Sequence, residues 1–261
     1  MHASEGMHWY TRDGKPAYTV TGKDGFERPA TLRDARKLNL VPSVTTIIKC
    51  AAAPGLERWK QDQVLHSALT LPRGDGEAEA AWIERVWTDS KETARKASER
   101  GTAIHAAIQN FYLTGQCERP MYPHIESACE AIAKWSQLDT ECAMVEQSFG
   151  CPLGFGGKVD FSCTAPYIVV DFKTKEFDTE ADLKTWDSHW MQLAAYRAGL
   201  EMPKARCAIV YVSVNNPGLS QLIEITEEEL QKGWRMFLGL LQFWQARAGY
   251  NSSWLPEQKA A

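Results

Sequence analysis

The spacing of hydrophobic and polar positions changes near residue 140 and divides this chain into two parts. Beyond that point, short β-branched runs bounded by turn residues predict five strands, at 142–149, 156–163, 167–173, 206–214 and 220–225. Helical spacing intervenes at 187–200 and returns from Glu227 to about Ala248, after Thr226 as a suitable N-cap. This order of strands and helices predicts an α/β fold with a mixed central sheet flanked by helices.

The part before residue 140 has a mainly helical pattern. Residues 7–30 are an exception, because their aromatic, Gly and Thr residues predict a β-ribbon with turns at Asp13-Gly14 and Asp24-Gly25. Thr31 and Ser43 are suitable N-caps for two short helices. Longer helices are expected over part of 56–69, over 77–114 with a candidate break at Thr88-Asp89-Ser90, and over 123–138.

These elements indicate one principal domain. We expect it to span residues 41–250, with a helical part (41–140) wrapped on an α/β core (141–250). Residues 1–40 would contribute the N-terminal β-ribbon and a short helix. The tail, residues 251–261, is expected to be mobile.

Composition and charge narrow the function classes. A net charge of −4 argues against general binding of polyanions, although it leaves room for nucleic acid in one groove lined by cations. No apolar run approaches the ~18 residues of a membrane span, and the N-terminus lacks the apolar core of a secretory signal. The seven cysteines never form a CxxC pair, which indicates reduced thiols, a cytoplasmic location and no zinc knuckle.

The stretch 156–175 carries the most informative polar residues. Asp160 and Asp171 lie at the ends of two apolar runs, and a turn at 164–166 would bring them together. Asp171 and Lys173 point to one face of their strand and Phe172 to the other, because strand side chains alternate. Charges on a strand suited to burial are costly unless they are paired or bound to metal. Two carboxylates and an ammonium therefore suggest a hard divalent cation beside a phosphate.

These residues also resemble a known family. Gly157-x-x-Asp160 followed by Asp171-Phe-Lys173 resembles the core of the PD-(D/E)xK nucleases, specifically the RecB-like exonuclease branch, with Val-Asp in place of Pro-Asp. Three further segments fit in order along roughly residues 41–215. They are PSVTTIIK…GLERWK (42–60), similar to mitochondrial genome maintenance exonucleases and phage-type relatives, Gly101-Thr-Ala-Ile-His105, and Gln192-Leu-Ala-Ala-Tyr196.

The resemblance implies a restriction-endonuclease-like fold and an exonuclease that uses Mg²⁺ or Mn²⁺ on single-stranded or duplex DNA ends. Phage or bacterial replication, recombination or repair would be its setting, with a recombination annealing or single-strand-binding protein as a partner. Lys173 would assist the attacking water, and Gln192 and Tyr196 would border the active site as catalytic-site residues, unless they are only the polar flank of an amphipathic helix. The implied metal ligands are His105, Asp160, Asp171, the backbone carbonyl of Phe172 and, near a second ion, Glu146, which fits a solvated strand position almost equally well.

Candidate DNA contacts combine basic and aromatic residues near these motifs, since aromatic rings stack on unpaired bases and cations bind phosphates. The same residues would be ordinary in solvated helix faces and strand ends. The candidates are Arg58, Trp59, Lys60, Lys91, Arg95, Lys96, Arg100, Thr174, Lys175, Trp186 and Trp190, whereas His189 is expected to have only a surface role.

Two other functions fit the same residues: a site-specific or structure-specific endonuclease of the same fold, and a DNA-end-binding module without catalysis. An iron–sulfur cluster of the kind found in some RecB-like nucleases does not fit, because it needs three late cysteines. Only Cys207 follows the predicted catalytic segment.

Overall fold

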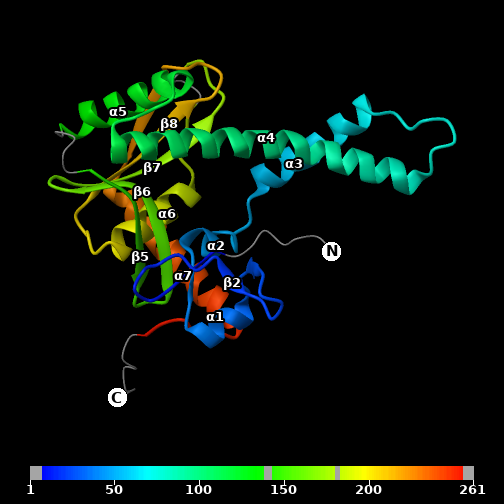
Figure 1. Cartoon of the computed structure of the whole chain (residues 1–261). Helices are drawn as coiled ribbons and strands as arrows, with labels where there is room; N and C mark the ends of the chain where they lie inside the picture. The colour runs from blue at the N-terminus through cyan, green and yellow to red at the C-terminus, as the bar shows by residue number, and fades with distance from the viewer. Residues whose placement is uncertain (1–7, 138–142, 180–182, 255–261) are drawn as a thin grey trace.

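The computed structural model describes residues 8–137, 143–179 and 183–254. Its centre is a five-stranded mixed sheet in the order β5-β6-β7-β8-β9 (Figure 1). The strands are β5 Met144–Cys151, β6 Phe155–Thr164, β7 Tyr167–Lys175, β8 Arg206–Ser213 and β9 Ser220–Ile225. Only β7 and β8 pair in parallel, and the connection between them contains α6 (Asp187–Gly199). The predicted mixed sheet and α/β class are confirmed.

The predicted strands and helices of this half agree closely with the structure. Strand ends differ by one or two residues, except that Cys142 lies outside the described residues. Helix α7 spans Glu227–Ala248 and begins at Thr226, whose Oγ1 accepts a hydrogen bond from Glu229 N at 3.2 Å. In turn, the Glu229 carboxylate accepts a hydrogen bond from Thr226 N at 2.8 Å. The two bonds form a capping box, which fixes the start of the helix.

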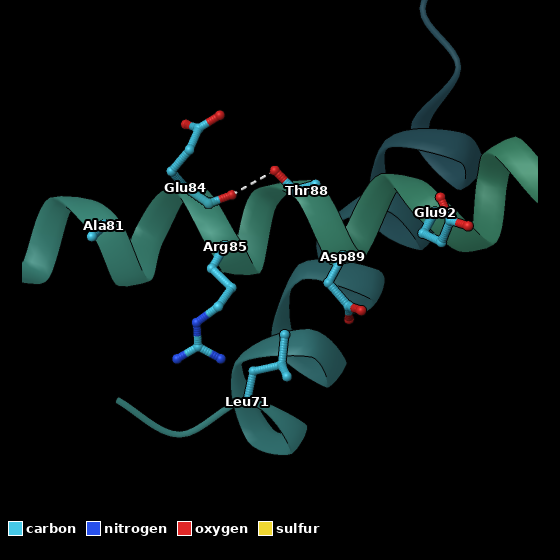
Figure 2. A pocket seen from close by; sticks show the side chains of 7 residues that line it. All are labelled: Leu71, Ala81, Glu84, Arg85, Thr88, Asp89 and Glu92. Carbon is cyan, nitrogen blue, oxygen red and sulfur yellow. Dashed lines mark hydrogen bonds between the residues drawn. The ribbon is translucent and has the colours of Figure 1, made fainter. Parts of the chain in front are cut away.

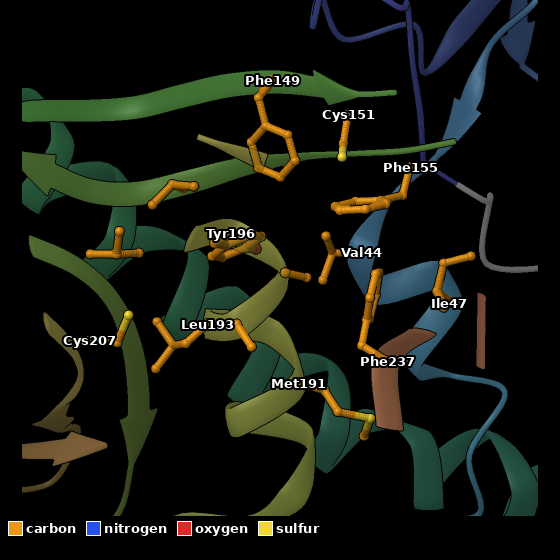
Figure 3. Close-up of a cluster of buried hydrophobic side chains, with 14 of the residues drawn as sticks. Val44, Ile47, Phe149, Cys151, Phe155, Met191, Leu193, Tyr196, Cys207 and Phe237 are labelled. Carbon is orange, nitrogen blue, oxygen red and sulfur yellow. The ribbon is translucent and has the colours of Figure 1, made fainter. Parts of the chain in front are cut away.

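The sheet separates two hydrophobic clusters. On β7, the side chains of Ile168, Val170 and Phe172 belong to the cluster under α4 (Glu79–Thr114) and α5 (Tyr122–Ser136), whereas Val169 belongs to the cluster under α6 and α7. Figure 3 shows part of the cluster under α6 and α7, where Phe149 and Phe155 of the sheet meet α6, α7 and α2 (Val44–Ile48). Alternation along one strand therefore fills both layers, and it leaves Asp171 and Lys173 on the α6 face.

The N-terminal ribbon is two small sheets. β2 (Thr19–Thr21) pairs with β3 (Glu27–Pro29), but β1 (Trp9–Tyr10) pairs with the later β4 (Val41–Pro42). Both predicted turns contain a glycine with positive φ, +88° at Gly14 and +81° at Gly25. Helices α1 (Leu32–Leu38) and α2 (Val44–Ile48) follow their predicted caps. Trp9 is fully buried in the cluster shared with α7, so the ribbon packs directly on the main domain.

The helical part differs from the expectation in two ways. Helix α3 (Pro54–Thr70) pairs with the first half of α4 (Glu79–Thr114), and this helical hairpin projects from the sheet (Figure 1). It does not wrap on the sheet as expected; only the later turns of α4, with Ile104 and Ile108, pack there beside α5 (Tyr122–Ser136). The predicted break in α4 is also wrong, because the helix is continuous from Glu79 to Thr114. Thr88 Oγ1 and Ser90 Oγ donate to carbonyls of the preceding turn, which lets these polar residues lie inside the helix.

Residues 251–254 of the predicted mobile tail are held against the turn between β5 and β6. Ser252 Oγ donates to Gly154 O at 2.6 Å, and Trp254 N donates to Pro152 O at 3.0 Å. These four residues therefore belong to the packed domain, contrary to the expectation of mobility. None of the helices in the described ranges is long and apolar enough to cross a bilayer.

Candidate active site

The two aspartates lie where β6 and β7 separate. Paired positions run from Thr164↔Tyr167 to Phe161↔Val170, so the next position in the register would place Asp160 opposite Asp171. The ladder stops there, and Asp160 Oδ2 instead accepts a hydrogen bond from Phe172 N at 2.9 Å. The turn at 164–166 thus brings the carboxylates together as the sequence predicts, at an opening between two strands.

Lys173, Gln192 and Tyr196 surround Asp171 on the α6 face. Lys173 Nζ lies 2.6 Å from Asp171 Oδ2, and Gln192 Nε2 donates to Asp171 Oδ1 at 2.7 Å. Gln192 Oε1 also accepts a hydrogen bond from Lys173 Nζ at 3.2 Å, and Gln192 Nε2 donates one to Tyr196 Oη at 2.8 Å. Gln192 therefore connects the strand motif to the helix motif, and both predicted helix residues face the site.

His105 approaches from the other layer. Its Nδ1 lies 3.7 Å from Asp160 Oδ2, and its ring packs edge-on against Phe172 with centroids 6.1 Å apart. Gly101 makes this approach feasible, since a Cβ there would lie 2.7 Å from Thr174 Oγ1. The glycine one turn before His105 therefore lets α4 pass closely over the end of β7.

Burial and mutual repulsion set the electrostatics of the site. Burial, and then the charge of Asp171, raise the pKa of Asp160 to about 7. Burial lowers the pKa of Lys173, but the negative charge of Asp171 raises it by more. The pKa of Lys173 therefore stays above its usual value. Burial also lowers the pKa of His105, so the imidazole is neutral near pH 7. A cation bound next to Asp160 would favour its ionised form.

The donor types fit a hard divalent cation, which prefers carboxylate and carbonyl oxygens and tolerates an imidazole. The described residues, however, include no group of three or more His, Cys, Asp or Glu side chains arranged as a metal centre. Both oxygens of Asp171 are already engaged, by Gln192 and Lys173. Asp160, His105 and the Phe172 carbonyl are the residues that fit the ion, and Asp171 would join them through its remaining lone pairs.

Glu146 occupies the register position opposite Asp160 and has a left-handed backbone, with φ of +55°. Near it, β6 changes the face that it buries: Val159 belongs to the cluster under α6, whereas Phe161 belongs to the one under α4. The carboxylate of Glu146 forms an ion pair with Lys158. Strained backbone at a site of this kind is a common sign of function.

Lys158 was not a candidate from the sequence, although its charge influences the pKa values of both Asp160 and His105. It stands at a variable position of the Gly157-x-x-Asp160 motif, where the motif itself gives no signal. A cation two residues before a candidate ligand on the same strand was the only clue. His189 was misjudged as a surface residue: burial, and then Lys173, lower its pKa to about 4, and its ring lies beside Tyr211.

The predicted DNA contacts are spread over the molecule. Thr174 and Lys175 end β7 beside the site, and Arg100 lies near them on α4, with Nη2 3.8 Å from Glu176. The structure does not bring the remaining basic candidates to the site. Arg58 and Lys60 pair with Asp62 and Glu57 on α3, which also carries Trp59, and Arg95 pairs with Glu92 and Glu99 on α4.

The other two tryptophan candidates lie at the start of α6. Trp186 is exposed, whereas Trp190 is half-buried beneath Lys232, whose Nζ lies 4.9 Å from the centroid of the Trp190 ring.

The α3–α4 hairpin has a depression on its surface, away from the candidate site (Figure 2). Its lining residues include Leu71, Arg85, Glu84, Asp89 and Glu92, and the side chains of Arg85 and Asp89 point toward Leu71. This acidic lining does not suit a polyanion.

Comparisons with known proteins give little further guidance. The sequence matches no protein-family model and no curated protein. Several solved structures are similar to it, and two of them are described here. One, from Eubacterium rectale and named "Putative exonuclease", is 13% identical over 57% of this chain and 68% of that chain, with a TM-score of 0.37. The other, SSO0001, is 17% identical over 47% of this chain and 57% of that chain, with a TM-score of 0.27. At these values neither likeness carries a functional argument.

Proposed function

We propose that this protein is a deoxyribonuclease that requires Mg²⁺ or Mn²⁺ and degrades DNA from its ends. The observation that supports the proposal most is the convergence of the motif residues. They come from α4, β6, β7 and α6, yet they meet around Phe172: His105 and Asp160 on one side, and Asp171, Lys173 and Gln192 on the other. Buried carboxylates next to a lysine suit cleavage of a phosphodiester.

In this proposal Asp160, Asp171, His105 and the Phe172 carbonyl would hold the cation, and Glu146, now paired with Lys158, would serve a second ion. A bound cation would activate a water and neutralise charge on the phosphate. Lys173, kept protonated by Asp171, donates hydrogen bonds to the charge that develops on the phosphate or orients the water. Gln192 is a positioning residue for Lys173, and Tyr196 holds Gln192 in turn.

The test is digestion of 5′- and 3′-labelled single-stranded and duplex DNA with Mg²⁺, with Mn²⁺ and with a chelator. Lys173→Ala should lower the rate by about 10²- to 10³-fold, the typical loss when one transition-state donor is removed. Lys204→Ala, an exposed lysine at the opposite end of the β7–β8 pair, is the matched control. If no DNA is digested by the wild type with either metal, the proposal fails.

The dependence on ends has its own test, because an endonuclease of the same fold would have the same site. Circular single strands and closed duplex circles should resist digestion that linear DNA of the same sequence undergoes. Cutting of circles at fixed positions would instead identify a site-specific enzyme. We place the activity in the cytoplasm, in phage or bacterial replication, recombination or repair, beside a single-strand-binding or annealing protein.

A further inference from the structure

Two aromatic rings of the N-terminal ribbon form a stacked pair, of which His8 is exposed and Tyr18 is half-buried. The rings of His8 and Tyr18 have centroids 4.6 Å apart and an interplanar angle of 26°. Tyr18 is held in place by Tyr10, because the two hydroxyl groups lie 2.7 Å apart. His8 is exposed, and its backbone oxygen accepts from Ser43 N at 2.9 Å. The ribbon thus presents a fixed aromatic surface to solvent.

This pair lies at one end of the strand that carries Asp160. Ser43 forms a parallel bridge with Gly156, and a Cβ at Gly156 would lie 2.8 Å from Tyr10 Cβ. From Gly156 the strand reaches Lys158 and then Asp160 in steps of roughly 7 Å per two residues. Gly156, where the ribbon packs on β6, is therefore roughly 13 Å along the strand from Asp160.

Two lysines accompany the pair. Partial burial lowers the pKa of His8, and the nearby ammonium groups of Lys49 and Lys158 lower it further. The imidazole is therefore neutral near pH 7 and suited to stacking, while the charge is supplied by the lysines. Lys158 stands between Gly156 and Asp160 along β6, where its ammonium group forms an ion pair with Glu146. Aromatic rings next to cations are the usual means of binding an unpaired base and its phosphate.

We propose that His8 and Tyr18, with Lys49 and Lys158, form a subsite for one unpaired nucleotide of the DNA strand whose phosphate is cleaved beside Asp160. The proposal rests on the nuclease function proposed above. It makes a single strand, or the frayed end of a duplex, the substrate at the site, because a base paired inside a duplex cannot stack on a protein ring.

The test is the binding of labelled single-stranded oligonucleotides to a Lys173→Ala protein, measured by fluorescence anisotropy in Mg²⁺. One set of oligonucleotides carries a single abasic residue at successive positions. One such position should weaken binding about fivefold, the lower end of the range for a stacked base. Adding His8→Ala or Tyr18→Ala should weaken binding of the intact strand by a similar factor and abolish the effect of the abasic residue.

Three controls accompany this test. Tyr18→Phe keeps the ring but loses the hydroxyl contact with Tyr10, so it should bind more tightly than Tyr18→Ala. Phe26→Ala removes a ribbon aromatic that is 75% exposed but outside the pair, and it should bind as the parent protein does. Thermal melting checks each fold. If the abasic effect survives in both His8→Ala and Tyr18→Ala while the wild type still digests DNA, the subsite is wrong and the nuclease proposal stands. If the protein neither binds nor digests any DNA, both are wrong.

Discussion

The candidate site and the projecting α3–α4 hairpin use charge in opposite ways. At the site, Asp171 is 2% exposed and pairs with Lys173, while Gln192 joins them from another element. In the hairpin, Arg58 is 78% exposed and pairs with Asp62 one turn away on the same helix. The site pair buries the Asp171 carboxylate, although the Lys173 side chain keeps 32% of its surface exposed. It also involves a partner from another element, Gln192, whereas the hairpin pair is exposed and lies within one helix.

The difference indicates where function is concentrated. Exposed pairs one turn apart add a few tenths of a kcal/mol to a helix and keep its surface soluble. A buried pair often stabilises a fold no better than apolar residues of the same size, so the protein gains little stability from keeping one. The charged residues of the site are therefore better explained by a catalytic or binding role than by a contribution to stability. Those of the hairpin need no such role, because exposed pairs are ordinary on a helix surface.

The largest effect should come from breaking the buried pair on one side only. Lys173→Met leaves Asp171 buried without its cation, and we expect the free energy of unfolding to fall by about 3 to 4 kcal/mol. Chemical denaturation without metal measures this. The double variant Asp171→Leu with Lys173→Met should recover most of the loss, because neither charge remains. A double variant as unstable as the single one would contradict the comparison.

Close packing near the site should give the next largest effect. A Cβ on Gly233 of α7 would lie 2.4 Å from the backbone carbon of Trp190 on α6, where no side chain can move aside. We expect Gly233→Ala to cost about 2 to 3 kcal/mol, measured by denaturation. Gly239→Ala is the control on the same helix, since nothing lies near its Cβ, and it should stabilise by up to about 1 kcal/mol. Equal effects of the two would refute this account.

The sheet and its two C-terminal helices could be predicted because independent local signals agree. β-Branched runs, turn residues and the Thr226–Glu229 cap all indicate the same boundaries. The motif residues could also be placed, since alternation on β7 puts Asp171 and Lys173 on one face. Helical spacing similarly puts Gln192 and Tyr196 together on α6.

Other features could not be predicted, because they depend on contacts between distant segments. A helical pattern does not say what the helix packs against, so the projection of α3 and α4 was missed. In α4 the hydroxyl groups of Thr88 and Ser90 bond back to carbonyls of their own helix, so residue types that often end a helix lie inside one. Lys158 and His189 acquire their surroundings only when β6 and α6 meet the motif residues.

The pH dependence of stability offers a smaller test. The pKa of Asp160 is raised from 3.8 to about 7 in the folded protein, so folding binds a proton between these values. Its stabilising contribution is fully present below about pH 4 and is lost as the pH rises through 7. With a chelator present, the stability of the wild type relative to Asp160→Asn should fall by about 2 kcal/mol from pH 5 to pH 8. Parallel curves would show that the buried site does not perturb Asp160.

The smallest effect belongs to the exposed pair of the hairpin. Arg58→Met removes the contact between Arg58 Nε and Asp62 Oδ1, 3.3 Å in length, and should change the free energy of unfolding by at most about 0.5 kcal/mol. About 1 M NaCl should erase even that difference, because solvent ions screen exposed charges. The Lys173→Met deficit should persist in the same salt, since Asp171 is shielded from solvent ions. A loss at Arg58 that is large or insensitive to salt would mean that the hairpin shares the energetics of the site.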